Sequence, residues 1–309
     1  MDAINPNELC MRFAVLDGLG DFRHSFILRH PEISVDAERD EVLERLGPWH
    51  REQVAGLGFD PVALKLVAQV HGNGVAVIEE GNSESFFTGQ DGMVSDRAGI
   101  MLGIYVADCA AVYLADPVGG AFGLVHSGKK GTESGIAAVA LRLMMERFGT
   151  RPGNVLAQVS PCIRPPAYEV DFAAEIRRQC LGCGVLPEHF HDCGVCTSSD
   201  LRRYYSYRME KGRTGRMLAL LARADGRCHD LGKLSSGCNK PPCPSSCNRL
   251  CNRMSKPFFP IIPEYLRNIR DRSLLQPLRH RLPTGGVHPH VERRVEAKTH
   301  PPPGLVKLR

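Results

Sequence analysis

The sequence predicts an α/β (α+β) protein: a single layered domain of mixed β-sheets flanked by helices, followed by a tail of different composition. Three observations lead to this prediction. Short apolar runs rich in β-branched residues recur between residues 64 and 160. Amphipathic segments with helical spacing lie between and outside these runs. Tight turns join neighbouring runs, which favours antiparallel pairing within layered sheets.

Six runs have the length and residue types of strands, and three longer segments are typical of helices. The expected strands are 64–70, 74–80, 100–106, 110–116, 121–126 and 154–160. The expected helices are 34–47, 132–149 and 171–180. In the second of these helices, apolar residues from Ile136 to Met144 recur at helical spacing, and Gly149 is placed to end the helix.

The charge of the chain divides near residue 225. From Gly226 onward, 16 Lys and Arg residues face 5 Asp and Glu residues, and the same segment holds 12 of the 22 prolines. The preceding residues carry 23 basic against 29 acidic side chains. A basic, proline-rich segment with few apolar runs buries too little apolar surface to offset its ordering entropy. We therefore predict one folded domain over 1–224 and a disordered basic Pro/Cys-rich tail over 225–309.

Nothing in the sequence indicates export or a membrane span. No uninterrupted apolar run reaches the roughly 18 residues that a membrane helix needs. The first ten residues lack the basic flank and apolar core of a signal peptide. The predicted location is the cytoplasm, where cysteines are reduced thiols or metal ligands. Nucleic-acid binding is expected at most weakly, through the basic tail.

The segment "GLVHSGKKGTESG" (123–135) approximates a nucleotide-binding loop. Gly123, Gly128 and Lys129 fit the spacing of that motif, but Lys130 stands where Ser or Thr would bind Mg²⁺. Residues 124–126 also continue a strand, whereas the motif needs an open loop there. ATP binding is therefore disfavoured. What remains is a short basic turn before a helix, which suits a small anion.

Three potential metal ligands follow or end expected strands: His71, Cys109 and His126. Imidazole and thiolate groups are good zinc ligands, and three protein ligands leave a fourth position open for water or substrate. Because the three residues are far apart in the sequence, a second interpretation stays open. In that interpretation each His is a polar turn residue and the Cys is a buried small hydrophobe. Asp108 and Gln69 are candidates for orienting or proton-transfer groups.

Five segments occur together in the order and approximate spacing of one family. They are "QVHGNGV", "DGMVSDRAGIMLGIYVADCAAVYLAD", "GLVHSGKKGT", "SPCIRPPAYEV" and "CTSSDLRRYYSYRMEKGRTGRM". From about Leu64 to Leu221 the chain resembles the bacterial laccase-domain family, long called multicopper polyphenol oxidoreductases and now regarded as purine nucleoside phosphorylases. The resemblance implies a mixed α/β domain with layered sheets. It also implies a catalytic zinc bound at the positions of His71, Cys109 and His126.

The resemblance further implies the reaction and its partners. These are phosphorolysis of adenosine, inosine and methylthioadenosine with phosphate, giving free base and ribose-1-phosphate, and accessory deamination of adenosine. The residues expected to bind phosphate or purine are Lys129, Lys130, Tyr168 and Arg208, with Tyr207 as a second stacking candidate. The family usually has Arg where this chain has Lys130, which is a point-charge donor without the bidentate geometry of Arg. The alternative interpretation of both lysines is a solvated basic turn.

Two other enzyme classes remain as alternatives. A cysteine hydrolase or deamidase would use Cys109 as the nucleophile and His126 as the base. A polyphenol oxidase-type oxidoreductase would need copper, and a multicopper cluster needs many imidazoles. The predicted folded part offers one His-x-His pair, His189 and His191. Copper is therefore less expected than zinc.

A third alternative is a non-enzymatic zinc module. Two Cys-x-x-Cys pairs nine residues apart could form a structural zinc knuckle. Their members are Cys180, Cys183, Cys193 and Cys196. Such a site could also coexist with the catalytic one.

Overall fold

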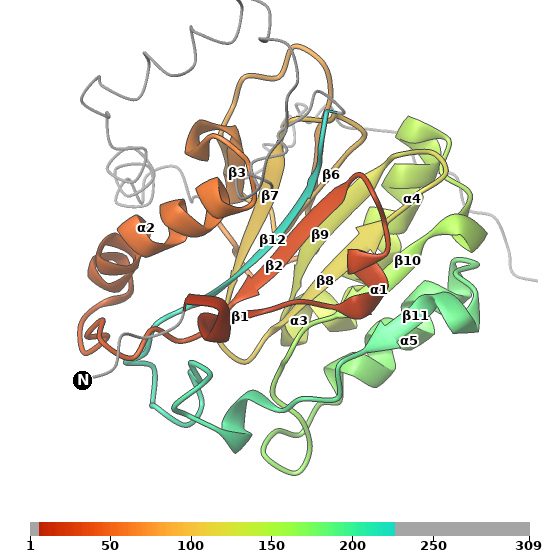
Figure 1. The fold of residues 1–309 in the computed structure, drawn as a ribbon. Helices are drawn as coiled ribbons and strands as arrows, with labels where there is room; N and C mark the ends of the chain where they lie inside the picture. The colour runs from red at the N-terminus through yellow and green to blue at the C-terminus, as the bar shows by residue number, and fades with distance from the viewer. Residues whose placement is uncertain (1–5, 226–309) are drawn as a thin grey trace, which may run out of the picture. The chain divides into compact units, whose positions relative to one another are not determined.

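The computed structural model describes residues 6–225, and Figure 1 shows them as two layered sheets with helices on either side. The predicted α/β class is confirmed, with two mixed six-stranded sheets. The chain divides into two compact units, Met1–Arg272 and Ser273–Arg309, and the described residues all belong to the first. The predicted disordered tail lies outside the described residues apart from Asp225, so its nature stays a prediction.

The first sheet combines strands from both ends of the domain. Its order is β1 (Cys10–Met11), β2 (Phe22–Ile27), β12 (Met217–Arg223), β7 (Met101–Val106), β3 (Leu64–Val67) and β5 (Phe86–Phe87). The long strand β12 pairs antiparallel with both β2 and β7. Strand β3 runs parallel to β7 and β5. The C-terminal strand of the domain therefore lies at the centre of this sheet.

The second sheet is built around a buried hairpin. Its order is β11 (Phe190–Asp192), β10 (Leu156–Val159), β8 (Ala110–Ala115), β9 (Phe122–Ser127), β6 (Gly92–Ser95) and β4 (Val75–Ile78). Every residue of the β8–β9 hairpin strands is buried, which explains why these strands are mostly apolar rather than alternating. The register pairs Ala111 of β8 with His126 of β9, and this pairing fixes the place of one predicted metal ligand.

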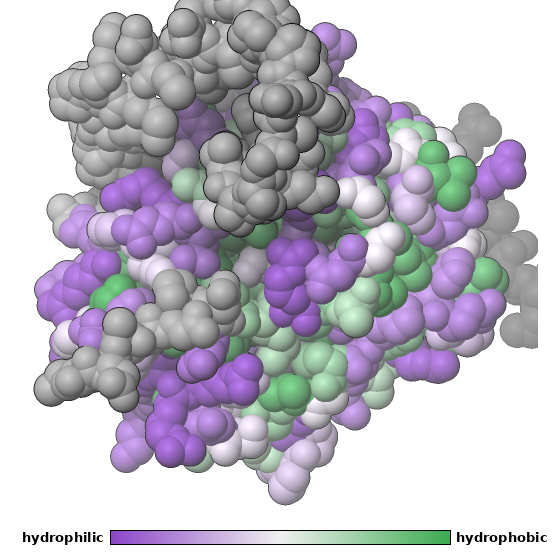
Figure 2. Space-filling view, in the orientation of Figure 1, coloured by the Kyte–Doolittle hydropathy of each residue, from purple (hydrophilic) through white to green (hydrophobic). Residues whose placement is uncertain are grey.

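Five helices lie around the two sheets within residues 6–225. They are α1 (Ala14–Asp17), α2 (Arg39–Gly56), α3 (Lys129–Glu133), α4 (Ile136–Phe148) and α5 (Phe172–Gly182). Short 3₁₀ turns cover Pro6–Leu9, Pro61–Ala63, Pro152–Asn154, Pro187–His189 and Thr197–Ser199. Helix α2 packs on the first sheet, and α4 and α5 pack on the second (Figure 1). Figure 2 shows hydrophilic side chains over the outward face of α2, as expected for a helix that buries one side against a sheet.

The largest core cluster lies between the two sheets. It joins residues of the first sheet, such as Phe26 and Ile104, to residues of the second, such as Tyr113 and Phe122. The order of layers is therefore helix, sheet, sheet, helix. No helix within residues 6–225 has both the length and the apolar character of a membrane span.

The structure confirms the six expected strands but changes several boundaries. The first ends at Val67 because Gln69 and His71 adopt left-handed backbone angles, φ 54° and 61°, which cannot continue a strand. The single helix expected over 132–149 is two helices, since Gly135 at φ 76° separates α3 from α4. Gly149 ends α4 with φ 66°, as predicted.

Helix α2 also differs from its predicted range of 34–47. It begins at Arg39 and continues past Pro48 to Gly56. Proline removes one helical hydrogen bond, yet Leu46 and Trp49 on either side of it are buried against the sheet. Tertiary packing therefore overrides the local penalty.

Several strands of the structure are not among those predicted from the sequence, and two of them are central to the first sheet. Strands β2 and β12 were not predicted, although "MLALLAR" (217–223) is a continuous apolar run. Such a short run fits a strand or a buried helical segment equally well by periodicity.

A hydrogen bond between the sheets gives a stability prediction. The buried Tyr113 hydroxyl on β8 donates to the Ser25 carbonyl on β2 at 2.9 Å. We expect Tyr113→Phe to lower the free energy of unfolding by about 1 kcal/mol, since one buried bond is lost without a large cavity. Urea denaturation measures this change. The control is Tyr207→Phe, because Tyr207 is 56% exposed. The free energy of unfolding of this variant should stay within about 0.5 kcal/mol of the wild-type value. Equal stability of both variants would contradict the prediction.

Candidate metal centre

The fold brings the three predicted metal ligands together. The potential ligand atoms of His71, Cys109 and His126 all lie within 4.8 Å of one another. The two imidazole rings are 4.9 Å apart between centroids and nearly perpendicular, at 84°. His71 is exposed, Cys109 is half-buried and His126 is buried. Within residues 6–225 this is the one group of three or more His, Cys, Asp or Glu side chains that could hold a metal ion.

The site forms where the two sheets meet. Cys109 lies in the short connection from β7 of the first sheet to β8 of the second. His126 is the penultimate residue of β9, and His71 lies in the loop between β3 and β4, which belong to different sheets. Left-handed backbone angles at His71 and at Asp108, φ 61° and 81°, turn the chain at two of these positions. Residues distant in sequence therefore converge because of the sheet topology.

Asp91 organises the site, although the sequence analysis did not identify it. Its carboxylate is fully buried and lies 2.8 Å from Nδ1 of His126. The same carboxylate accepts the backbone N–H groups of His71 at 2.8 Å and Gly72 at 2.7 Å. A carboxylate on Nδ1 leaves Nε2 of His126 for a metal, the usual outer-shell arrangement of a metal-bound histidine. In the sequence, Asp91 is the first residue of one of the five family segments, but nothing in its local pattern indicates a role beside the candidate ligands.

The turn after His126 leaves room beside the three ligands. A Cβ atom on Gly128 would lie 3.0 Å from Sγ of Cys109 and 3.2 Å from Cδ2 of His71. Only a residue without a side chain fits there without displacing a ligand. The two imidazoles, the thiol, the orienting carboxylate and this space together fit a bound metal ion.

The Cys109 thiol and the His126 imidazole perturb each other's titration. Burial opposes the thiolate, but the charges and hydrogen bonds of His126 and His71 outweigh it and lower the pKa of Cys109 to about 6. Burial also opposes the imidazolium, but the charge of Cys109 and the hydrogen bond to Asp91 raise the pKa of His126 to about 9. Without metal, the pair therefore favours thiolate and imidazolium.

The alternative of a zinc knuckle built from four cysteines is not borne out among the residues that the structure describes. Cys180 is buried within α5 and Cys183 follows it at the end of the helix. Among residues 6–225, neither these two nor Cys193 and Cys196 belong to a group that could hold a metal. All four are free thiols, so burial in the second core cluster explains Cys180.

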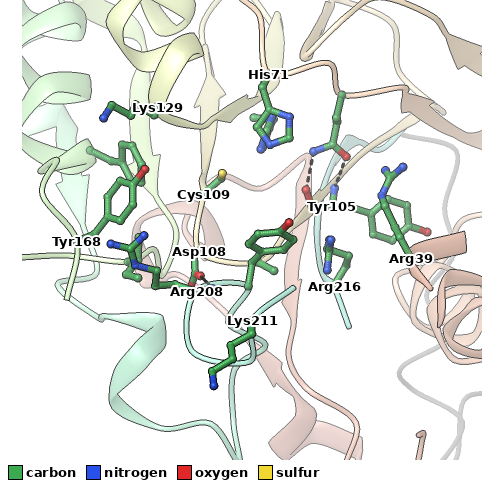
Figure 3. Close-up of a pocket in the computed structure, with 16 residues that line it drawn as sticks. Arg39, His71, Tyr105, Asp108, Cys109, Lys129, Tyr168, Arg208, Lys211 and Arg216 are labelled. Carbon is green, nitrogen blue, oxygen red and sulfur yellow. Dashed lines mark hydrogen bonds between the residues drawn. The ribbon is translucent and has the colours of Figure 1, made fainter. Parts of the chain in front are cut away.

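The three ligands open into a cavity of about 660 Å³, which Figure 3 shows with its lining side chains. Gln69 and Asp108 line it, as do Lys129, Tyr168 and Arg208. Lys130 is exposed and is not among the lining residues. Five of the six residues expected to act beside the three ligands therefore line the cavity, and Lys130 lies outside it.

Gln69 and Asp108 have their polar atoms engaged by protein groups. The Gln69 amide donates to the Tyr105 carbonyl at 2.6 Å and accepts the Tyr105 N–H at 3.1 Å, the dashed lines in Figure 3. The Asp108 carboxylate accepts the Thr197 hydroxyl at 2.6 Å and the Arg208 backbone N–H at 2.7 Å. The Gln69 bonds connect the loop after β3 to β7, and the Asp108 bonds connect the turn before β8 to the segments of Thr197 and Arg208.

The remaining predicted substrate residues form a contact set around Glu169. The Lys129 amine donates to Glu169 at 2.9 Å, and the Arg208 guanidinium lies 3.9 Å from the other oxygen of that carboxylate. The Arg208 guanidinium also lies over the Tyr168 ring, 5.3 Å from its centroid.

The cavity wall includes four polar residues that were not predicted from the sequence: Arg39, Tyr105, Lys211 and Arg216. Arg39 begins α2 and Tyr105 lies in β7. Only the assembled fold shows that these ends of the helix and the strand face the cavity.

The fold and the site define an α/β protein with a three-ligand His/Cys centre at the edge of a basic cavity. A family model described as multi-copper polyphenol oxidoreductase laccase matches residues 49–175 and 170–224. The chain belongs to this family, and the resemblance inferred from its motifs is confirmed.

Known relatives and solved structures agree with this membership. Purine nucleoside phosphorylase YlmD of Geobacillus stearothermophilus is 28% identical over 246 residues, which cover 67% of this chain and 87% of that protein. A purine nucleoside phosphorylase of Deinococcus radiodurans is 34% identical over 192 residues, covering 54% of this chain and 73% of that protein. The crystal structure of YlmD from Geobacillus stearothermophilus has a TM-score of 0.60 at 24% identity and covers 67% of this chain and 93% of that chain. It therefore shares the fold.

The role of Asp91 gives a prediction about metal affinity. We expect Asp91→Asn to weaken metal binding by about 10- to 100-fold, because the variant loses the charge that orients His126. Competition with a chromophoric chelator measures the affinity. Asp116→Asn is a matched control, since Asp116 is also buried and accepts the backbone N–H groups of Val118 and Gly119 in the distant β8–β9 turn. An equal loss in both variants would show a general effect of removing a buried carboxylate.

The lowered pKa of Cys109 predicts how its reactivity depends on pH. In metal-free protein, iodoacetamide should modify Cys109 slowly below about pH 6, where the thiol is protonated, and reach a plateau above it. Peptide mass spectrometry resolves this cysteine from the others. Bound metal should block the reaction. A midpoint near the ordinary value of about 8.5 would contradict the thiolate–imidazolium pair.

Proposed function

We propose that this protein is a zinc-dependent purine nucleoside phosphorylase with accessory adenosine deaminase activity. The observation that carries the proposal is the convergence of His71, Cys109 and His126 at a basic, aromatic-lined cavity. The relatives described above carry the name purine nucleoside phosphorylase. The family model matches residues 49–175 and 170–224, which include all three candidate ligands. The substrates proposed are adenosine, inosine and methylthioadenosine, with inorganic phosphate as the second substrate.

His71, Cys109 and His126 would hold the zinc ion. When bound by three protein ligands, zinc supplies Lewis-acid chemistry and an open position for water or substrate. Thiolate and imidazole donors select zinc over the hard cations, which prefer oxygen ligands. Asp91 fixes the ring of His126 for this task through Nδ1, and it holds the loop of His71 through backbone N–H groups.

Phosphorolysis needs an anion site and a surface for the purine. Lys129 and Arg208 both line the cavity, and a cleft with excess positive charge concentrates anions such as phosphate. Lys129 is the better placed of the two lysines expected from the sequence, because Lys130 lies outside the cavity wall. Tyr168 and the exposed Tyr207 offer ring faces for stacking a purine.

We assign Asp108 a positioning role within this proposal. Its carboxylate is bonded to the Thr197 hydroxyl and to the N–H of Arg208. Through the second bond it sets the backbone from which the Arg208 side chain reaches the cavity. Asp108 directly precedes Cys109 in the chain, so its bond to Arg208 couples the position of Arg208 to that of the proposed ligand Cys109.

A cysteine hydrolase is the second candidate, favoured by the thiolate–imidazolium pair of Cys109 and His126. Such a pair attacks a carbonyl carbon when the thiolate is unligated. Zinc would remove this reactivity, because a ligated thiolate is not free to attack. The two candidates therefore respond to zinc in opposite directions.

The reaction can be tested by following adenosine with HPLC, using zinc-loaded full-length protein with and without phosphate. We expect release of adenine that depends on phosphate, with inosine as a minor product from deamination. His126→Ala should lower the rates of both reactions at least 100-fold. Loss of a residue that only supports a metal ligand already lowers activity about 10- to 100-fold, and loss of the ligand itself should have a larger effect.

The other outcomes of this experiment discriminate between the candidates. Inosine formation without any dependence on phosphate would leave a deaminase and contradict the phosphorylase. Neither product, from protein that is folded and contains zinc, would overturn both nucleoside reactions. Amide hydrolysis that zinc inhibits would favour the cysteine hydrolase.

A further inference from the structure

The cavity carries more positive charge than one phosphate ion requires. Its lining includes five Lys and Arg residues: Arg39, Lys129, Arg208, Lys211 and Arg216. Among the lining residues that the structure describes, Asp108 supplies the one carboxylate, and its oxygens accept bonds from Thr197 and Arg208. A cleft with this balance favours ligands with more than one anionic group.

The basic residues lie on two sides of the metal ligands. In Figure 3, Lys129, Tyr168 and Arg208 lie on one side of Cys109, whereas Arg39 and Arg216 lie on the other side, near the Tyr105 label. The first side includes the pair that contacts Glu169. In this view Cys109 lies between the two groups, an arrangement that suits two anionic groups rather than one phosphate ion.

The two arginines of the second side are positioned by a helix and a strand. Arg39 is the first residue of α2, and Arg216 directly precedes β12. The Arg216 guanidinium donates to the carbonyls of Thr214 and Gly215, and it lies over the Tyr207 ring at 5.7 Å. Such contacts hold an arginine in place before a ligand arrives, which lowers the entropic cost of binding. Guanidinium groups match phosphate geometry in a bidentate manner.

We propose that Arg39 and Arg216 bind a phosphate group carried by the substrate itself, so that the site accepts purine nucleoside 5′-monophosphates. The inference rests on the proposed phosphorolysis, in which inorganic phosphate uses the side of Lys129 and Arg208. The second anion must then belong to the nucleoside, whose 5′ carbon is the usual place for a phosphate. A volume of about 660 Å³ is within the usual range for small-molecule sites, about 300–1,000 Å³.

The reaction with a monophosphate balances without any further reactant. An oxygen of inorganic phosphate forms a bond to C1′, and the bond from C1′ to N9 of the purine breaks. The bonding pair leaves with the purine, which takes up a proton. The products are the free base and ribose 1,5-bisphosphate, and the 5′-phosphate is unchanged.

The test compares AMP with adenosine in zinc-loaded full-length protein. Binding of each is measured by isothermal titration calorimetry, and turnover is measured by HPLC at several phosphate concentrations. The variants are Arg39→Gln, the charge-conserving Arg39→Lys and the control Arg202→Gln, whose side chain is 95% exposed and outside the cavity. Circular dichroism and zinc content confirm that each variant is folded and loaded.

We expect AMP to bind at least about tenfold more tightly than adenosine. Arg39→Gln should reduce that preference about tenfold, because a charge-assisted bond of this kind contributes an energy equivalent to about a tenfold change. Arg39→Lys should restore part of the preference, and Arg202→Gln should retain it.

Other results would overturn the inference or separate it from the proposed function. If Arg39→Gln instead raises the KM for inorganic phosphate and leaves the preference for AMP unchanged, this side binds the co-substrate and the inference fails. It also fails if adenosine is cleaved while AMP is neither bound nor cleaved. Arg39-dependent binding of AMP without turnover of either compound would support the phosphate site and overturn the phosphorylase activity.

Discussion

The buried carboxylate of Asp91 is the interaction on which the rest of the site depends. It lies against Nδ1 of His126 on β9 and accepts the backbone N–H groups of His71 and Gly72 in the loop after β3. One side chain thus joins two candidate metal ligands that come from different parts of the chain. A buried carboxylate is stable only when charge or hydrogen bonds compensate it, and these contacts lower the pKa of Asp91 against the effect of burial.

The meeting of the two sheets explains why the site is also a cavity. Cys109 lies where the chain passes from one sheet to the other, so its thiol is at the edge of the core that the sheets share. The loops beyond this edge bring in Arg208 and Lys211, while α2 and the start of β12 bring in Arg39 and Arg216. Basic residues from separate elements therefore surround one centre, which concentrates negatively charged ligands there.

Much of the fold and of the centre could be predicted from the sequence, for identifiable reasons. Strands such as β7 and β8 are continuous apolar runs, and Gly149 marks a helix end; both signals are local and can be read from neighbouring residues. Strand β12 was missed because a short apolar run fits a strand or a buried helix equally well. The zinc knuckle is not borne out, since Cys-x-x-Cys spacing does not show whether thiols face each other; Cys180 is buried inside α5.

The α/β class, the family and the three candidate ligands could all be predicted from the order of the residues alone. These follow from residue periodicity and from motifs that are contiguous along the chain. The folded structure was needed to show that His71, Cys109 and His126 converge, that Asp91 supports them, and that Lys130 lies outside the cavity. Convergence depends on strand order and register, which are set by packing between residues far apart in the chain.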